Sequence, residues 1–147
     1  MLLRIYLKTT KAICMGKINK MIFIDASFYL SLLNPNDSNH QKAIELSEQH
    51  KKGDYATSQS VLGEVLTVGS QRFDKSLTVE FVEEIFKSHT KIVLEKRELV
   101  KDAFNFFKSV KSKNVSWVDS YSFVIMKRLG IKKLLTFDKH LKQLARS

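Results

Sequence analysis

The sequence of 147 residues lacks several features that would restrict its fold or its location. It has a single cysteine, Cys14, so no disulfide can form within the chain, which fits a reducing cytoplasm. No apolar run approaches the roughly 20 residues that a transmembrane helix needs, so we expect no membrane partner. The first residues are a poor secretory signal, because their apolar side chains precede the charged ones and no apolar core follows. We therefore predict a cytoplasmic protein.

Acidic residues are absent from the first twenty positions. Residues 1–20 carry five basic side chains, half of the net charge of +10, and the isoelectric point is about 9.7. We predict that residues 1–20 are a basic N-terminal extension outside the fold, for example through a start assigned too early. A nucleic-acid-binding arm is the alternative. Residues 21–147 are then one domain, which carries the other half of the charge and is only moderately basic. The basic character of the whole chain suggests a polyanionic partner, most often nucleic acid.

The stretch M-I-F-I-D-A-S at residues 21–27 organises the rest of the chain. Its unbroken apolar run is typical of a strand buried on both faces in a parallel sheet. Asp25 follows at the carboxyl end of this strand, the edge where ligands bind in open α/β sheets. Asp25 is either a metal ligand or only the N-cap of the helix that follows. These residues alone favour the cap.

The end of the chain repeats this pattern. A buried strand over 134–137 runs into Asp138, and a helix follows over 139–146. Strands and helices alternate between the two ends, which predicts an α/β fold: a three-layer α/β/α sandwich with a mostly parallel central sheet. The other strands are expected over 55–57 and 91–94, and the other helices over 26–33, 39–52, 58–72, 77–87, 97–110 and 117–129.

Three local predictions accompany these elements. Asp37 or Ser38 should cap the second helix, and Gly53 should end it. The aromatic residues of the helix over 97–110 share one face with Leu99 and Ala103, so we expect Phe106 and Phe107 to belong to the core and not to a base-stacking platform.

Two further acids lie near the starts of helices. Glu64 falls beside the apolar stripe of Val61, Val65 and Val68, where it is either a ligand or a first-turn residue favoured by the helix dipole. Asp119 follows Ser116 at the spacing of a capping box, in a helix that is apolar nearly all round. Helices of such folds start at the sheet edge where Asp25 and Asp138 lie.

Four carboxylates could therefore gather at one rim of the sheet. Like charges repel there unless a cation lies among them, and an all-oxygen ligand set suits Mg²⁺ or Mn²⁺. An acidic cluster that holds such an ion on a basic protein is the equipment of a phosphodiesterase.

The residues resemble the PIN-domain ribonucleases, a family that includes the toxins of VapBC-type toxin–antitoxin pairs. The resemblance runs from Met21 to about Leu144. It rests on M-I-F-I-D-A-S, on the D-x-x-H-x-x-A spacing of Asp37, His40 and Ala43, on A-T-S-Q-S-V-L-G-E-V-L-T, and on S-W-V-D-S with K-R-L-G-I-K-K-L-L-T-F-D-K-H-L. Trp117 and Leu141 stand where the family more often has Phe, and the first twenty residues are atypical.

The resemblance implies a Mg²⁺- or Mn²⁺-dependent endoribonuclease. It assigns four residues as catalytic and as metal ligands: Asp25, Glu64, Asp119 and Asp138. The implied partners are an RNA substrate and a cognate antitoxin, with a homodimer left open. A phosphatase is disfavoured because Ser27 stands where a second Asp is normally found. The serious alternative is a non-catalytic module of the same fold that binds nucleic acid or a protein partner.

Overall fold

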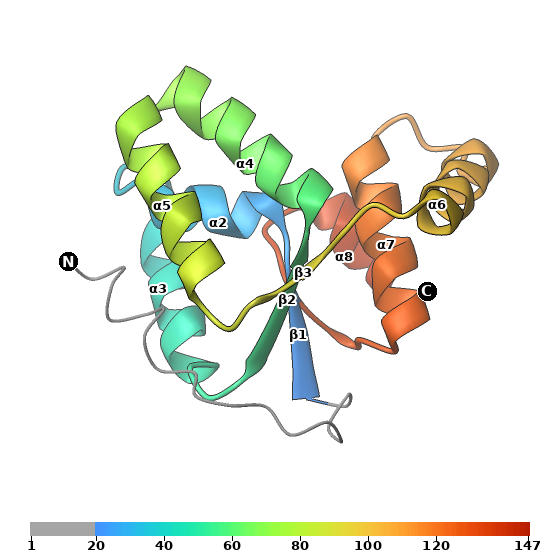
Figure 1. Ribbon diagram of the computed structural model, residues 1–147, viewed down its shortest axis with the longest axis horizontal. Helices are drawn as coiled ribbons and strands as arrows, with labels where there is room; N and C mark the ends of the chain where they lie inside the picture. Colours follow the sequence, from blue (N-terminus) through green and yellow to red (C-terminus); the bar gives the residue numbers. More distant parts are fainter. Residues whose placement is uncertain (1–19) are drawn as a thin grey trace.

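The computed structural model describes residues 20–147 (Figure 1). Residues 1–19, which hold most of the predicted basic extension, lie outside the described residues. Within the described part, the strands are β1 (Met21–Ile24), β2 (Asp54–Ser58), β3 (Lys91–Val93) and β4 (Lys133–Leu135). The helices are α2 (Ala26–Leu33), α3 (His40–Gln49), α4 (Gln59–Arg72), α5 (Lys75–Lys87), α6 (Arg97–Ser109), α7 (Trp117–Leu129) and α8 (Lys139–Arg146). None of them is long and apolar enough to cross a membrane.

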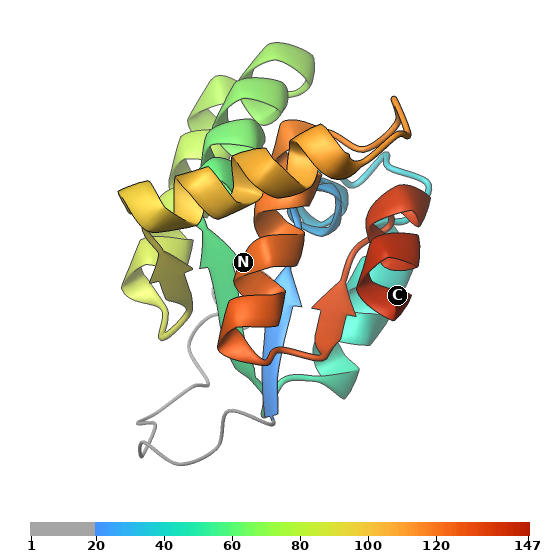
Figure 2. The ribbon, with the colours of Figure 1, turned by 90° about the vertical axis from the view of Figure 1, so that its right-hand side faces the viewer.

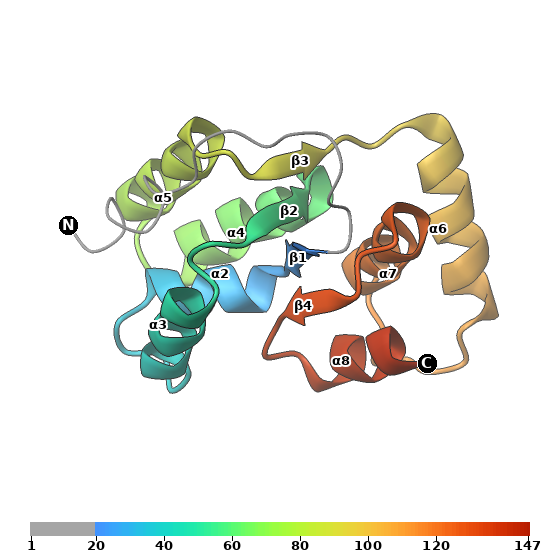
Figure 3. The same cartoon turned by 90° about the horizontal axis from the view of Figure 1, so that it is seen from below.

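The four strands form one parallel sheet in the order β3-β2-β1-β4, and their arrows point the same way in Figure 2. Helices α2 to α5 gather on one side of the sheet, whereas α6 to α8 lie on the other (Figures 1 and 3). This confirms the predicted α/β/α sandwich. Strand β1 lies between β2 and β4, which explains why Ile22, Phe23 and Ile24 are all buried.

Strand β4 is shorter than predicted. It ends at Leu135, and the next two residues leave the ladder, because the backbone N–H groups of Phe137 and Asp138 donate to side-chain hydroxyls. The run of apolar letters alone could not reveal these acceptors, which come from Ser27 and Thr136.

Helix α3 also differs from prediction at both ends. Its N-cap is Asn39, which makes no side-chain capping bond, and Asp37 instead accepts from the Asn39 backbone at 2.8 Å. The helix ends at Gln49, well before Gly53, because the His50 carbonyl accepts from the Gly53 N–H at 2.7 Å in a following turn.

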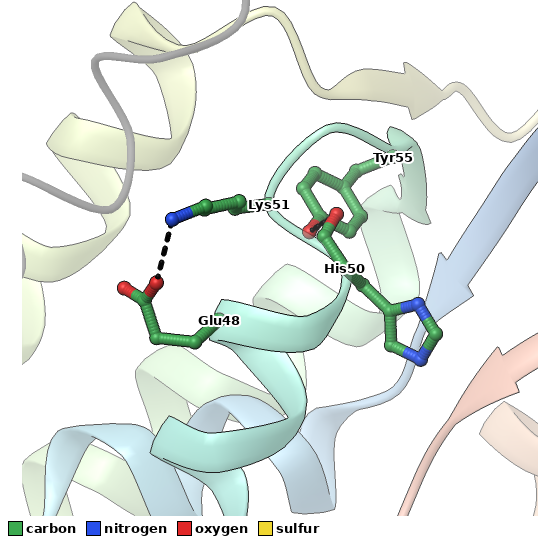
Figure 4. Close-up of polar contacts among 4 residues, drawn as sticks. All are labelled: Glu48, His50, Lys51 and Tyr55. Carbon is green, nitrogen blue, oxygen red and sulfur yellow. Dashed lines mark hydrogen bonds and ion pairs between the residues drawn. The ribbon is translucent and has the colours of Figure 1, made fainter.

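The Tyr55 hydroxyl donates to the same His50 carbonyl and so ties this turn to β2 (Figure 4). The pairing of Lys51 with Glu48 at 3.3 Å is exposed and contributes little.

The D-x-x-H spacing has a structural role in this fold. Ser31 of α2 donates through its hydroxyl to Asp37 at 3.1 Å, and its carbonyl lies 2.8 Å from Nδ1 of His40. Ser31 is buried. The two partners therefore fasten the loop between α2 and α3 to the last turn of α2.

The prediction for Phe107 is wrong. Phe106 stacks on Phe123 with ring centroids 4.4 Å apart, but the Phe107 side chain is 42% exposed and Phe104 is 55% exposed. Helix α6 lies across the single helix α7 and not against the sheet, so only a narrow stripe of its surface is covered (Figure 2).

Candidate active site

Asp25 lies at the carboxyl end of β1 and is the N-cap of α2. Its Oδ2 accepts three hydrogen bonds, from the Ser27 backbone at 3.2 Å, the Ser27 hydroxyl at 2.7 Å and the Thr136 hydroxyl at 2.8 Å. Within the described residues, Oδ1 receives no hydrogen bond. Only 4% of the residue is exposed. The capping interpretation is therefore correct, yet it occupies one oxygen and leaves the other available.

Asp138 follows β4, the neighbour of β1 in the sheet, and is the N-cap of α8. Its Oδ1 accepts from the backbone N–H groups of His140 at 2.7 Å and Leu141 at 2.9 Å. As with Asp25, the cap uses a single carboxylate oxygen. Parallel pairing of β1 with β4 brings both aspartates to the same edge of the sheet, the upper edge in Figure 2.

Asp119 lies in the first turn of α7 and forms the predicted capping box with Ser116. Its Oδ2 accepts from the Ser116 N–H at 2.8 Å, and its own N–H donates to the Ser116 hydroxyl at 3.0 Å. The residue is 8% exposed, and burial raises the pKa of its carboxyl. The bonds from Ser116 lower that pKa, whereas the charges of Asp138 and Asp25 raise it.

Glu64 lies in the second turn of α4, so the first-turn dipole explanation does not apply. Within residues 20–147, its carboxylate takes part in no hydrogen bond and no ion pair. Its pKa is raised to about 7, first because burial disfavours the charged form. The charges of Asp25, Asp119 and Asp138 add to this rise, which places these three carboxylates within electrostatic reach of Glu64.

Within residues 20–147, no basic side chain forms an ion pair with any of these four acids. The ion pairs of the described residues involve only other acids, namely Glu45, Glu48, Glu84 and Asp102. Within the described residues, no group of three or more Asp, Glu, His or Cys side chains is placed so that it could hold a metal ion. The donor set nevertheless fits a hard divalent cation, because it offers carboxylate oxygens that the caps leave free.

Two residues beside these acids were not predicted to belong to the site. Ser27 follows Asp25 by two positions and Thr136 precedes Asp138 by two, and both hydroxyls contact Asp25. Their spacing from the two acids was visible in the sequence. What the sequence does not show is that the two segments, about 110 residues apart, meet at one carboxylate.

The chain is similar to known proteins both in sequence and in structure. The family model of the PIN domain matches residues 22–147. The 23S rRNA-specific endonuclease VapC20 of Mycobacterium tuberculosis, from strains CDC 1551 and H37Rv, is 29% identical over 118 residues, which cover 80% of this chain and 89% of that protein.

The crystal structure of M. tuberculosis VapC20, described as a sarcin–ricin loop cleaving toxin, superposes with a TM-score of 0.78. The sequences are 26% identical, and the match covers 83% of this chain and 93% of the solved one.

Proposed function

This chain belongs to the PIN domain family, and we propose that it is a metal-dependent endoribonuclease that hydrolyses phosphodiester bonds in RNA. The proposed catalytic and metal-binding residues are Asp25, Glu64, Asp119 and Asp138. The observation that supports this proposal is that Asp25 and Asp138 follow neighbouring parallel strands at the same sheet edge, with Asp119 also acting on the pKa of Glu64. A binding surface for RNA has no evident use for such repulsion next to a polyanion.

We propose Mg²⁺ or Mn²⁺ as the cofactor, held by the carboxylate oxygens that the helix caps leave free. When bound, such an ion would neutralise charge on the phosphate and lower the pKa of a water. The chain's own contribution is to hold Asp25 and Asp138 rigidly through their capping bonds. In the metal-free protein the pKa of Glu64 is about 7, so binding of a cation by this carboxylate would be coupled to release of its proton.

The substrate class follows from the relatives and from charge. VapC20 acts on 23S rRNA, and its similarity to this chain supports RNA as the substrate. The net charge of +10 favours a polyanion. We further propose that the protein is the toxin of a toxin–antitoxin pair, acts in the cytoplasm and binds a cognate antitoxin protein.

The test of nuclease function is a cleavage assay with single-stranded and structured RNA. We expect cleavage with Mg²⁺ or Mn²⁺ and none in EDTA, because carboxylates alone cannot neutralise the phosphate. Undiminished cleavage in EDTA would contradict the metal dependence. RNA binding with no cleavage under any metal would favour the non-catalytic alternative.

Toxin function predicts a distinct result in cells. Expression of the protein alone should arrest growth, and co-expression of a neighbouring antitoxin gene should relieve the arrest. The Asp25→Asn variant, expressed to the same level, is the control for effects of protein load. Normal growth during full expression of an active nuclease would count against the toxin, though not against the nuclease.

A further inference from the structure

The Ser27 hydroxyl joins the two segments that carry Asp25 and Asp138. It lies 2.7 Å from Asp25 Oδ2 and 2.9 Å from the Thr136 hydroxyl, and it accepts from the Phe137 N–H at 3.0 Å. The Thr136 hydroxyl in turn contacts Asp25 Oδ2 and accepts from the Asp138 N–H at 3.0 Å. The backbone N–H groups of Phe137 and Asp138 are therefore linked, each through one hydroxyl, to the same oxygen of Asp25.

The number of protons limits the possible directions of these bonds. Each hydroxyl has one proton to donate, and each already accepts from a backbone N–H. If both protons point to the ionised Asp25, both hydroxyls make charge-assisted bonds, which are shorter and stronger than neutral ones. The separations of 2.7 and 2.8 Å are ordinary for O–H···O bonds, and both are shorter than the 2.9 Å between the two hydroxyls. In that arrangement no proton lies between the hydroxyl oxygens of Ser27 and Thr136, so their contact is not a hydrogen bond.

Helix capping does not require this arrangement. Asp74 caps α5 by accepting from the Leu77 N–H alone, and Asp138 caps α8 with two backbone donors. Within the described residues, no side-chain hydroxyl donates to the carboxylate of Asp74 or Asp138, although each backbone is bonded to a threonine hydroxyl. Asp25 already caps α2 by accepting from the Ser27 N–H, so the bonds from the hydroxyls of Ser27 and Thr136 are not needed for the cap.

We propose that Ser27 is a positioning residue of the nuclease site. It holds Asp25 by Oδ2, which leaves Oδ1 as the oxygen offered to a divalent cation. Through the Phe137 N–H it also fixes the segment that leads from β4 to Asp138. Ser27 thus sets the relation between two carboxylates that come from opposite ends of the chain. This inference rests on the proposed nuclease function and concerns the same site.

The test compares Ser27→Ala with Ser31→Ala. Both variants remove one hydroxyl from α2 that bonds to an aspartate, but Ser31 bonds to Asp37, away from the site. Binding of Mn²⁺ alone is measured by electron paramagnetic resonance, without RNA, and melting temperatures are measured in EDTA. We expect Ser27→Ala to weaken Mn²⁺ binding by about tenfold, the lower end of the effect of residues that orient metal ligands.

Catalysis provides the second measurement. Ser27→Ala should lower kcat with the KM for RNA unchanged, because the substrate contacts remain. Ser27→Thr keeps the hydroxyl and should restore Mn²⁺ affinity and kcat. Ser31→Ala should lower the melting temperature and leave Mn²⁺ affinity at the wild-type level. If Ser27→Ala does not fold, Ser27→Cys keeps the volume with only weak hydrogen bonding and should show the same loss of affinity.

The outcomes separate this inference from the proposed function. Wild-type Mn²⁺ affinity in Ser27→Ala, or in Ser27→Cys if the first variant does not fold, would overturn the positioning role while RNA cleavage by the wild type still stands. If the wild type binds Mn²⁺ but cuts no RNA, the nuclease fails, and the affinities still decide the role of Ser27. A wild type that binds no Mn²⁺ overturns both.

Discussion

Replacing Asp25 with Asn is expected to reduce RNA cleavage by about a thousandfold. The Asn side chain has the same shape and keeps an oxygen for the Ser27 N–H, so the cap of α2 survives. What disappears is one negative charge among four carboxylates. Metal-ion catalysis supplies several kcal/mol, and the loss of about 4 kcal/mol corresponds to a factor of about a thousand. Initial rates with Mg²⁺ at saturating RNA measure this effect.

The same substitution should reverse its effect on stability when the metal is added. Two carboxylates about 5 Å apart repel by roughly 3 kcal/mol at an effective dielectric near 20, before salt screening. Removing this repulsion stabilises the variant, which offsets the weaker hydrogen bonds that Ser27 and Thr136 make to a neutral amide. In EDTA, the variant should therefore melt at or above the wild-type temperature. With millimolar Mg²⁺ the wild type should melt higher, because it gains binding energy that the variant lacks.

Asp74→Asn is the matched control, since Asp74 also caps a helix and lies outside the cluster. It should leave both cleavage and the Mg²⁺-induced shift in melting temperature unchanged. An active Asp25→Asn protein with the wild-type shift would show that Asp25 is a structural cap only.

Replacing Glu64 with Gln should abolish most cleavage and flatten the pH dependence of stability. In the metal-free protein, the pKa of Glu64 is raised from 4.5 to about 7. The folded state therefore holds a proton that the unfolded state releases between these values. The contribution of Glu64 to folding stability is therefore greatest below about pH 4.5, and it is lost as the pH rises through about 7.

Melting temperatures in EDTA between pH 5 and pH 8 test this sign. The wild type should lose stability across this range, and Glu64→Gln should lose less because Gln does not titrate. Some slope should remain, since the pKa of Asp119 is also raised. Glu80→Gln, on the exposed surface of α5, should retain the wild-type slope. Equal slopes in Glu64→Gln and the wild type would contradict the electrostatic coupling.

The sequence determined the features that depend on neighbouring residues. Three such features can be recognised within short stretches of sequence: the apolar run of β1, the capping box of Ser116 with Asp119, and the strand–acid–helix order at Asp138. Their hydrogen bonds join residues two or three positions apart, so a local pattern contains both partners. The family resemblance then assigned Asp25, Glu64, Asp119 and Asp138 to one site, and that assignment stays a prediction for catalysis.

Only the tertiary structure decided which distant groups meet and which faces are covered. The pairing of β1 with β4 places the Thr136 hydroxyl on Asp25, and the packing of α4 places Glu64 where burial and three charges raise its pKa. Phe107 has core-like spacing yet is exposed, because α6 covers one helix and not a sheet. The spacing of apolar residues in the sequence defines the apolar face of a helix. The topology of the fold determines which element packs on that face and which charges surround it.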